Sequence, residues 1–302
     1  MKDAARTIPP SALRPCTTLS ETMMLQRATT SAFWDFFRVP FQQAEAESRE
    51  YARTARGFDW KTALILVTTA VTLTIQEYAF GRAGVDWIPA ALDMLGATAQ
   101  AAALDTLLDD AQNLRLAERV YWAVGTLITY ILIPGLVVKV LFRERLRDFG
   151  LNVRGIHRSA WAYLVMLGVM VPVLLWISTT ERFLNYYPFY RLRSGEPLWP
   201  RFCIWEAFYV LQFFALEFFF RGFLVLGLRR RFGFYAIFAM MVPYCMIHFG
   251  KPMPETFAAI IAGIVLGFMS LKTRSIWFGA AIHVAVALGM DFLSLWRNGL
   301  LG

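Results

Sequence analysis

The chain has 302 residues, of which 57% are hydrophobic and 17% are charged, and its mean hydropathy is +0.47. Soluble domains average about 45–50% apolar and about 25% charged residues, so this composition excludes an ordinary water-soluble domain. The formal net charge is +8, but the arginines cluster between apolar runs, and no nucleic-acid-binding motif accompanies them. The charge therefore indicates membrane topology and contact with the headgroups of membrane lipid, and no nucleic-acid partner is expected.

The apolar residues gather in runs of about 15–22 residues, the length needed to cross a bilayer as a helix. Inside lipid the backbone must satisfy its own hydrogen bonds, so only helices and closed barrels can span. These runs are too long and too uniformly apolar for barrel strands. We therefore predict an all-α fold, a polytopic transmembrane helical bundle with about seven or eight spanning helices.

The first 58 residues are polar and form a predicted N-terminal region of their own. Within 31–56 an aromatic stretch precedes alternating acids and arginines, which indicates either an interfacial helix on the cytoplasmic leaflet or a solvated linker helix. The aromatic residues are Phe33, Trp34, Phe36, Phe37 and Phe41. Since the start lacks the residue order of a cleaved signal peptide, we expect the first spanning helix to insert the chain.

Seven runs are expected to span, and they divide into N-terminal transmembrane helices at 59–200 and core helices at 201–302. The runs are 61–80, 121–142, 160–178, 202–228, 234–248, 255–271 and 276–296. An eighth stretch, 87–108, is rich in alanine but carries aspartates. It is either a weak span or a helix that lies on the far surface.

The distribution of arginine and lysine predicts the orientation. Loop 143–159, turn 229–231 and loop 272–274 are basic, and all three fall on one side if the helices alternate. We expect that side to be cytoplasmic, although the opposite loop, 179–201, also carries arginines. The N-terminus is cytoplasmic if 87–108 does not span and external if it does. The predicted location is the plasma (inner) membrane, as a multi-pass integral protein.

Ionisable residues occur deep in three of the C-terminal runs. Glu217 and Arg221 lie four residues apart, on one helix face and in the favourable order. A charged group at membrane depth costs roughly 2.5–3.5 kcal/mol on insertion scales, so it requires a partner or a function. His248 ends a short run just before the prolines of 249–254, which end the helix, and His283 lies in the last run. We predict that these side chains converge.

Each of these residues also has a structural explanation. Glu217 and Arg221 suit a buried ion pair, and a membrane histidine commonly joins two helices by a hydrogen bond. Glu206 lies on nearly the same helix face as Glu217, where it either extends a polar lining or caps the outer end of the helix. Asp291 lies about two turns beyond His283, toward the membrane surface. Their occurrence together in the C-terminal third is what favours a site.

The order and spacing of these residues resemble the CPBP family, which comprises type II CAAX prenyl endopeptidases and bacteriocin-processing, Abi-like intramembrane proteases. The family motifs are EExxxR, FxxxH and HxxxN, and the corresponding stretches here are 216–221, 244–248 and 283–287. The resemblance covers about residues 143–302 and is strongest over 202–295. It implies a CPBP-type core in the transmembrane bundle.

Two positions depart from the family motifs. The first glutamate of EExxxR, which in the family activates the attacking water with the FxxxH histidine, is Leu216, and the asparagine of HxxxN is Ala287. Neighbouring residues on a helix point about 100° apart, so the next glutamate cannot simply replace the first. The resemblance carries over four catalytic residues: Glu217, Arg221, His248 and His283.

The resemblance implies an intramembrane endopeptidase in which a Glu/His pair assists the attack of water and a second histidine holds the oxyanion. Its partners would be a peptide or membrane-protein substrate, with prenylated substrates included. The alternatives are an inactive CPBP-fold protein that binds peptides or partner helices, and a transporter that uses the same polar cluster, although no internal repeat supports the latter.

No cofactor is expected from the sequence. Two histidines and a glutamate offer ligands that zinc accepts, so a divalent metal such as zinc stays an open alternative. The chain has no HExxH motif, however, and activation of water by a Glu/His pair requires no ion.

Overall fold

The structure is a computed structural model that describes residues 19–81, 84–193 and 195–301, with side chains described from residue 33 onward. The chain divides into two compact units, Met1–Gln43 and Ala44–Gly302. In the described ranges 79% of the residues are helical. These ranges contain no β-strand, although Leu151 and Ser275 form an isolated antiparallel bridge. The predicted all-α fold is confirmed.

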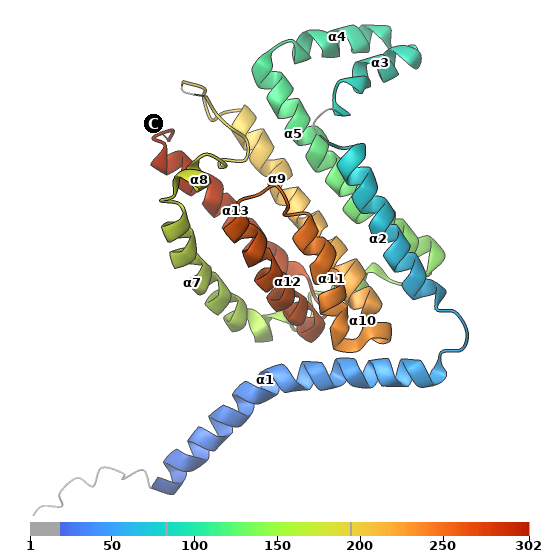
Figure 1. The fold of residues 1–302 in the computed structure, drawn as a ribbon, viewed down its shortest axis with the longest axis vertical. Coiled ribbons are helices and arrows are strands. Elements are labelled where there is room, and N and C mark those ends of the chain that lie inside the picture. Colours follow the sequence, from blue (N-terminus) through green and yellow to red (C-terminus); the bar gives the residue numbers. More distant parts are fainter. Residues whose placement is uncertain (1–18, 82–83, 194, 302) are drawn as a thin grey trace, which may run out of the picture. The chain divides into compact units, whose positions relative to one another are not determined.

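The helices follow one another along the chain, most of them with short connections (Figure 1). The α-helices of the first half are α1 Leu19–Thr54, α2 Trp60–Tyr78, α3 Trp87–Met94, α4 Thr98–Leu108, α5 Ala111–Leu127 and α6 Ile133–Leu136. Those of the second half are α7 Ala160–Ile177, α8 Glu181–Leu184, α9 Arg201–Glu217, α10 Gly227–Phe232, α11 Ala236–Met246, α12 Met253–Thr273 and α13 Trp277–Arg297.

Shorter or wider helical segments complete the chain path. The π-helical segments are η2 Ile128–Leu132, η3 Val137–Leu141 and η6 Phe218–Leu226, and the 3₁₀ segments are η4 Leu146–Phe149, η5 Ile156–Ser159 and η7 Gly233–Tyr235. Pro134 lies at the start of α6, between η2 and η3, where its missing N–H leaves a ladder hydrogen bond unmade.

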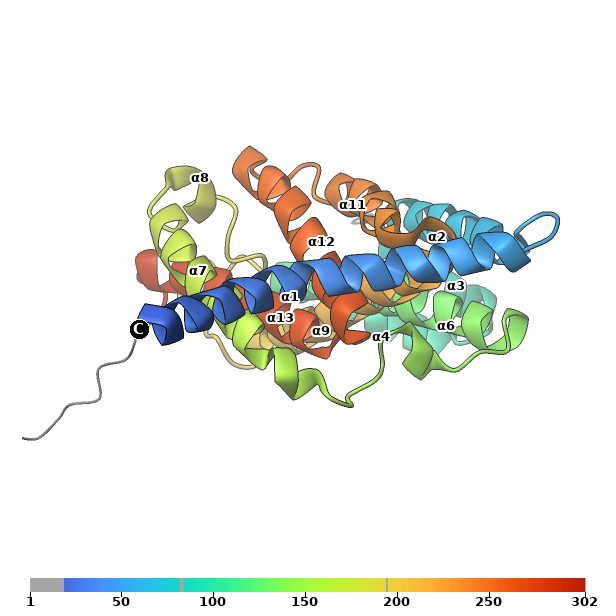
Figure 2. The same cartoon turned by 90° about the horizontal axis from the view of Figure 1, so that it is seen from below.

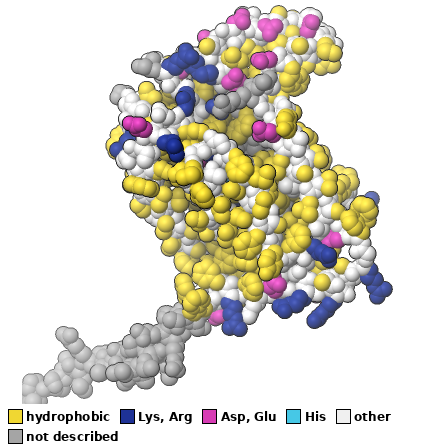
Figure 3. All heavy atoms as spheres, in the orientation of Figure 1, with side chains coloured by type: hydrophobic (Ala, Val, Ile, Leu, Met, Phe, Trp, Pro, Cys, Tyr) yellow, Lys and Arg dark blue, Asp and Glu magenta, His cyan; other side chains and the backbone are white. Residues whose placement is uncertain are grey.

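Five helical stretches of the described chain are long and apolar enough to cross a membrane. They are Ala111–Leu141, Ile156–Ile177, Arg201–Met246, Met253–Thr273 and Trp277–Arg297. The longest of them reverses direction at Gly233, whose φ of +56° suits glycine, so that α11 packs back against η6. The protein is therefore an integral, multi-pass membrane protein. Figure 3 shows hydrophobic side chains over the middle of one face, with charged side chains gathered toward its ends.

The stretch 87–108 forms two short helices and not one span. Helices α3 and α4 are 8 and 11 residues long, about 12 and 16 Å, against a hydrocarbon core of about 30 Å. Gly96, with a φ of +79°, lies in the connection between them. Of the two alternatives drawn from the sequence, the structure agrees with the one in which this stretch does not cross.

Helix α9 and its continuation η6 lie at the centre of the unit Ala44–Gly302. Helix α9 packs against α5 and α13, and η6 packs against α11 and α12, which lie side by side (Figures 1 and 2). All nine residues of η6 are buried. The longest and most buried of the five apolar stretches is thus the core around which the other helices gather.

The π-helical segment η6 begins directly after Glu217 and includes Arg221. Such wide turns are rare and frequently occur at functional sites. The backbone of η4, which precedes α7 in the chain, packs closely against η6. A Cβ on Gly222 would clash with the backbone carbonyl of Phe149. Only glycine allows this close approach of η4 to η6.

The three basic segments meet at one end of this unit. The Gly150 carbonyl accepts the N–H of Ile276 at 3.0 Å, which joins the first basic loop to the turn between α12 and α13. Glu47, in the part of α1 that belongs to this unit, pairs with Arg229 at 3.2 Å and with Arg274 at 2.5 Å. The clustering of basic loops on one side, as predicted, is present in the fold.

The other unit, Met1–Gln43, contains the aromatic stretch of α1. Phe33, Trp34, Phe37 and Phe41 are exposed there. This exposure suits the interfacial helix that the sequence suggests, and the interpretation stays a prediction.

The orientation can be tested with a reporter that is active only in the cytoplasm. Fused after residue 58, it is expected to be active, because α2 begins at the basic end and that end is predicted to be cytoplasmic. Fused after residue 109, between α4 and α5 at the opposite end of α2 and α5, it is expected to be silent. A silent reporter at residue 58 would contradict the orientation.

The close contact of Gly222 with Phe149 can be tested by a substitution that adds a methyl group at position 222. Gly222→Ala is expected to lower the free energy of unfolding by about 1–3 kcal/mol, the usual effect of overpacking a core. Gly168→Ala, in α7, is the matched control, since a Cβ there meets no atom within 4 Å. Thermal unfolding in detergent micelles measures both, and equal midpoints for the two variants would show that η4 does not dock as described.

Candidate functional site

The site is built on the buried carboxylate of Glu217, the last residue of α9, which is 0% exposed. Its Oε1 accepts a hydrogen bond from His283 Nδ1 at 3.0 Å and lies 3.1 Å from Arg221 Nη1. Its Oε2 has no hydrogen-bond partner among the described residues and faces Gly279, where a Cβ would lie 3.0 Å away. One carboxylate thus joins α9, η6 and α13.

The guanidinium of Arg221 lies over the ring of Tyr244, at 4.1 Å from the ring centre. Both residues are buried. The aromatic face attracts the cation, and the carboxylate of Glu217 neutralises it. Its nitrogens find no hydrogen-bond partner within the described ranges, so the pairing with Glu217 is one of charge more than of hydrogen bonding. Removing either partner would leave an uncompensated buried charge.

His248 follows the end of α11 and is buried. Its Nδ1 lies 2.8 Å from the carbonyl oxygen of Tyr244, and since a carbonyl only accepts, Nδ1 carries the hydrogen. The neutral ring therefore presents an unprotonated Nε2. Thr256, at the start of α12, donates to the His248 carbonyl at 3.0 Å and fixes the backbone where the helix ends.

Tyr244 is the common neighbour of these groups, and it was not among the predicted site residues. The centre of its ring lies 4.9 Å from the ring of His248 and 6.4 Å from that of His283. The sequence held a signal for it, because a residue four positions before His248 lies on the same helix face. Its ring separates Arg221 from bulk solvent and holds the cation in place.

The structure brings three of the four predicted residues into direct contact: Glu217, Arg221 and His283. His248 joins them through the Tyr244 ring, and no hydrogen bond or ion pair links it to Glu217 in the part of the chain that the structure describes. In the family motifs the histidine at the position of His248 activates water with the first glutamate, whose position here is Leu216, so an active variant would have to use Glu217 with His248. The observed partner of the carboxylate is His283.

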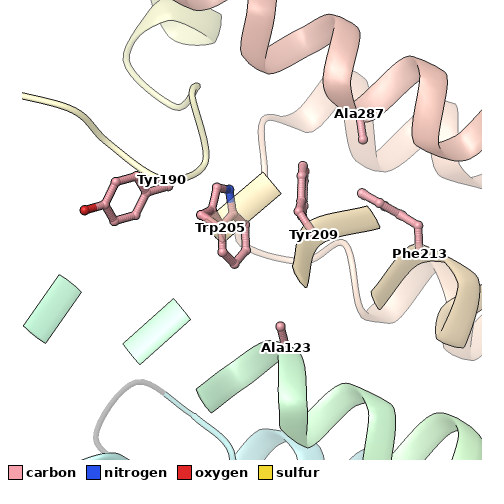
Figure 4. Packing of buried hydrophobic residues seen from close by; sticks show 6 residues of the cluster. All are labelled: Ala123, Tyr190, Trp205, Tyr209, Phe213 and Ala287. Carbon is pink, nitrogen blue, oxygen red and sulfur yellow. The ribbon is translucent and has the colours of Figure 1, made fainter. Parts of the chain in front are cut away.

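The two positions that depart from the family motifs are both buried and apolar. Leu216 is 6% exposed. Ala287 is 3% exposed and belongs to a hydrophobic cluster with Tyr209 and Phe213 (Figure 4). The Phe213 ring also lies 4.6 Å from the ring of His283. The region where the family places an amide is therefore an aromatic wall.

A divalent metal at this site would lie beside the fixed positive charge of Arg221. Oε1 of Glu217 is taken by His283 and by the cation of Arg221, and Nδ1 of His248 is taken by a backbone carbonyl. A dication here would have to displace or face the guanidinium. Within the described residues no three His, Cys, Asp or Glu side chains gather as metal ligands.

A comparison with protein families identifies the core of the bundle. Residues 197–289 match the family model of type II CAAX prenyl endopeptidase Rce1-like proteins. These residues form an Rce1-like domain. The match confirms the resemblance to the CPBP family that the motifs suggest. No curated protein and no solved structure matches the chain.

The Rce1-like domain runs from the residues just before α9 into α13. It therefore includes Glu217, Arg221, His248 and His283, and it also includes Leu216 and Ala287. The matched region is thus similar to type II CAAX prenyl endopeptidases.

The charge pairing in the Rce1-like domain can be tested by removing one partner. Arg221→Ala is expected to lower the free energy of unfolding by about 3–5 kcal/mol, because Glu217 then remains buried without a counter-charge. The double variant Glu217→Leu with Arg221→Met is expected to be much closer to wild type. Unfolding in detergent is the measurement.

The matched control for this prediction is another pair four residues apart. Lys251 and Glu255 are 2.6 Å apart and partly exposed, so Lys251→Ala is expected to cost about 0–1 kcal/mol. Equal effects of Arg221→Ala and Lys251→Ala would contradict the burial of the Glu217–Arg221 pair.

Proposed function

We propose that this protein is an intramembrane endopeptidase that uses water to cleave a peptide bond of a peptide or membrane-protein substrate, prenylated substrates included. The observation that carries the proposal is the hydrogen bond from His283 Nδ1 to the buried carboxylate of Glu217. A histidine oriented by a carboxylate is a recurring general base of hydrolases, and this pair lies in an Rce1-like domain.

The first step is the attack of water. With Nδ1–H held by Glu217, the neutral ring of His283 offers its Nε2 to the proton of the attacking water. As the oxygen of the water bonds to the carbonyl carbon, that proton moves to Nε2, and Glu217 stabilises the resulting imidazolium. Arg221, whose Nη1 lies 3.1 Å from the carboxylate, balances the negative charge of Glu217 in a site of low dielectric.

The second step breaks the C–N bond, and the proton held by His283 passes to the leaving nitrogen. The carbonyl oxygen carries negative charge between the two steps. We assign His248 to orient the attacking water, because its Nε2 stays unprotonated while Nδ1–H is bonded to Tyr244, and an unprotonated Nε2 accepts a hydrogen bond. A side chain positioned in this way typically contributes about 10²–10⁴ in rate.

A second candidate function is favoured by Leu216 and Ala287. Both occupy family motif positions that normally carry polar groups, and both are buried among apolar side chains. On this alternative the Rce1-like domain binds a peptide or a partner helix in the membrane and does not cleave it. The plasma (inner) membrane is the proposed location for either function, on the basis of the basic loops at one end of the bundle.

The deciding experiment is a cleavage assay in liposomes with prenylated peptides and with membrane-protein segments. Wild type is expected to cleave at least one of these. Glu217→Ala and His283→Ala are expected to abolish most of the activity, and His248→Ala to lower it by about 10²–10⁴-fold. The control is His157→Ala, since His157 lies in η5 outside the Rce1-like domain and should retain full activity.

Leu216→Glu separates the two candidate functions. If wild type does not cleave and Leu216→Glu does, the protein is a binding protein. Its fold then lacks only the carboxylate at position 216 for hydrolysis. If wild type and all the histidine variants cleave equally, the residues assigned here are not the catalytic ones.

A further inference from the structure

A second pair of ionisable side chains lies in the bundle, outside the cluster around Glu217. Glu206 extends from α9 and Asp291 from α13, and their carboxyl groups lie within hydrogen-bonding reach of each other. Asp291 is only 1% exposed. These are the same two helices that carry Glu217 and His283, and their contact here is about 16 Å along α9 from Glu217.

Three of the four carboxyl oxygens of this pair lack donors. Asp291 Oδ1 accepts the backbone N–H of Phe189 at 3.0 Å. Asp291 Oδ2 and both oxygens of Glu206 are buried and have no hydrogen-bond partner within the described part of the chain. The indole N–H of Trp205 lies close to Asp291 but is also without a bond of good geometry. Three buried acceptors therefore face each other without a hydrogen between them.

Charged and titratable groups of the neighbouring elements surround this pair. Lys251, in the connection before α12, is paired with Glu255 at 2.6 Å. Glu255 in turn accepts the hydroxyl of Tyr187 at 2.8 Å, and so adds another negative charge nearby. Tyr209, on α9, is buried, and on α5 Arg119 lies over the ring of Phe189, at 4.4 Å from the ring centre.

Two ionised carboxylates in contact at low dielectric repel each other strongly, so at most one of them stays charged. A proton between them turns one acceptor into a donor and satisfies the oxygens that are otherwise unpaired. We propose that Glu206 and Asp291 bind one shared proton, and that this carboxyl–carboxylate hydrogen bond fastens α9 to α13.

The shared proton makes Glu206 and Asp291 positioning residues for the Glu217–His283 hydrogen bond, because both contacts join the same two helices. This consequence for hydrolysis rests on the proposed function, whereas the proton itself does not. When the pH rises and the proton leaves, the two carboxylates repel. Stability and the alignment of His283 with Glu217 are then lost together toward high pH.

Glu206→Gln in the full-length protein tests the proposal, because an amide N–H donates to Asp291 at every pH. Wild type should show the infrared band of a protonated carboxylic acid, and Glu206→Gln should lack it. The thermal unfolding midpoint of wild type in detergent should fall by about 2–4 °C between about pH 6 and pH 9. That of Glu206→Gln should fall clearly less. Glu181→Gln, an exposed acid on α8, is the matched control and should behave as wild type.

Cleavage gives a readout that a purely structural role would not move. Between about pH 7 and pH 9 the activity of wild type should fall about tenfold, the change in the ratio of protonated to deprotonated pair that one pH unit produces. The activity of Glu206→Gln should fall by less than half as much.

The absence of the acid band, or parallel pH profiles of wild type and Glu206→Gln, would overturn the proposal. A midpoint that rises with added Na⁺ or Ca²⁺ at fixed pH would overturn it as well, in favour of a metal ion. Since the infrared and unfolding measurements need no turnover, a protein that passes both but cleaves nothing refutes only the proposed function.

Discussion

The structure depends on the pairing of one buried carboxylate, that of Glu217, within the membrane. Glu217 is fully buried, and its Oε1 is shared by Arg221 and His283. An isolated ionised carboxylate in an apolar interior is too costly to persist. Its two partners therefore have to be present in the folded state, and they come from separate segments of the chain. The pairing of Glu217 with Arg221 and His283 therefore sets the relative positions of α9, η6 and α13.

The surrounding fold provides those positions by close packing around η6. The wide π-helical turns start at Glu217, and Gly222 lets the backbone of Phe149 approach on the outside. Tyr244 of α11 covers Arg221 from the other direction. At the basic end, Glu47 ties the segment after η6 to the turn before α13 through Arg229 and Arg274. The same helices that bury the charge are thus held at their ends by further ion pairs.

Much of this architecture could be predicted from the sequence, because a membrane restricts the possible structures so strongly. The long apolar runs can span a membrane only as helices. Glu217 and Arg221, which are costly in free energy at membrane depth, indicated the centre of the bundle. What could not be predicted is the pairing across helices. The spacing of the motifs allowed Glu217 to meet either histidine, and only the packing of α13 against α9 decides that it meets His283.

Two other features lay beyond the reach of sequence patterns. The widening of the helix at η6 depends on packing from all sides, and hydrophobic periodicity carries no sign of it. The spacing of Tyr244 from His248 places both on one helix face, but the contact of Tyr244 with Arg221 also requires α11 to fold back on η6. The fate of 87–108 was also open until Gly96 was seen to divide it into two helices too short to cross.

Nuclear magnetic resonance of the histidine side chains tests the Glu217–His283 bond most directly, and the chain has only 3 histidines to resolve. With ¹⁵N-labelled histidine, the account predicts that His283 carries its hydrogen on Nδ1 in a strong bond, seen as a proton signal far downfield. Glu217→Gln should shift or remove this signal and leave that of His248 in place. A His283 signal like that of His157 in the loop, unchanged in Glu217→Gln, would contradict the account.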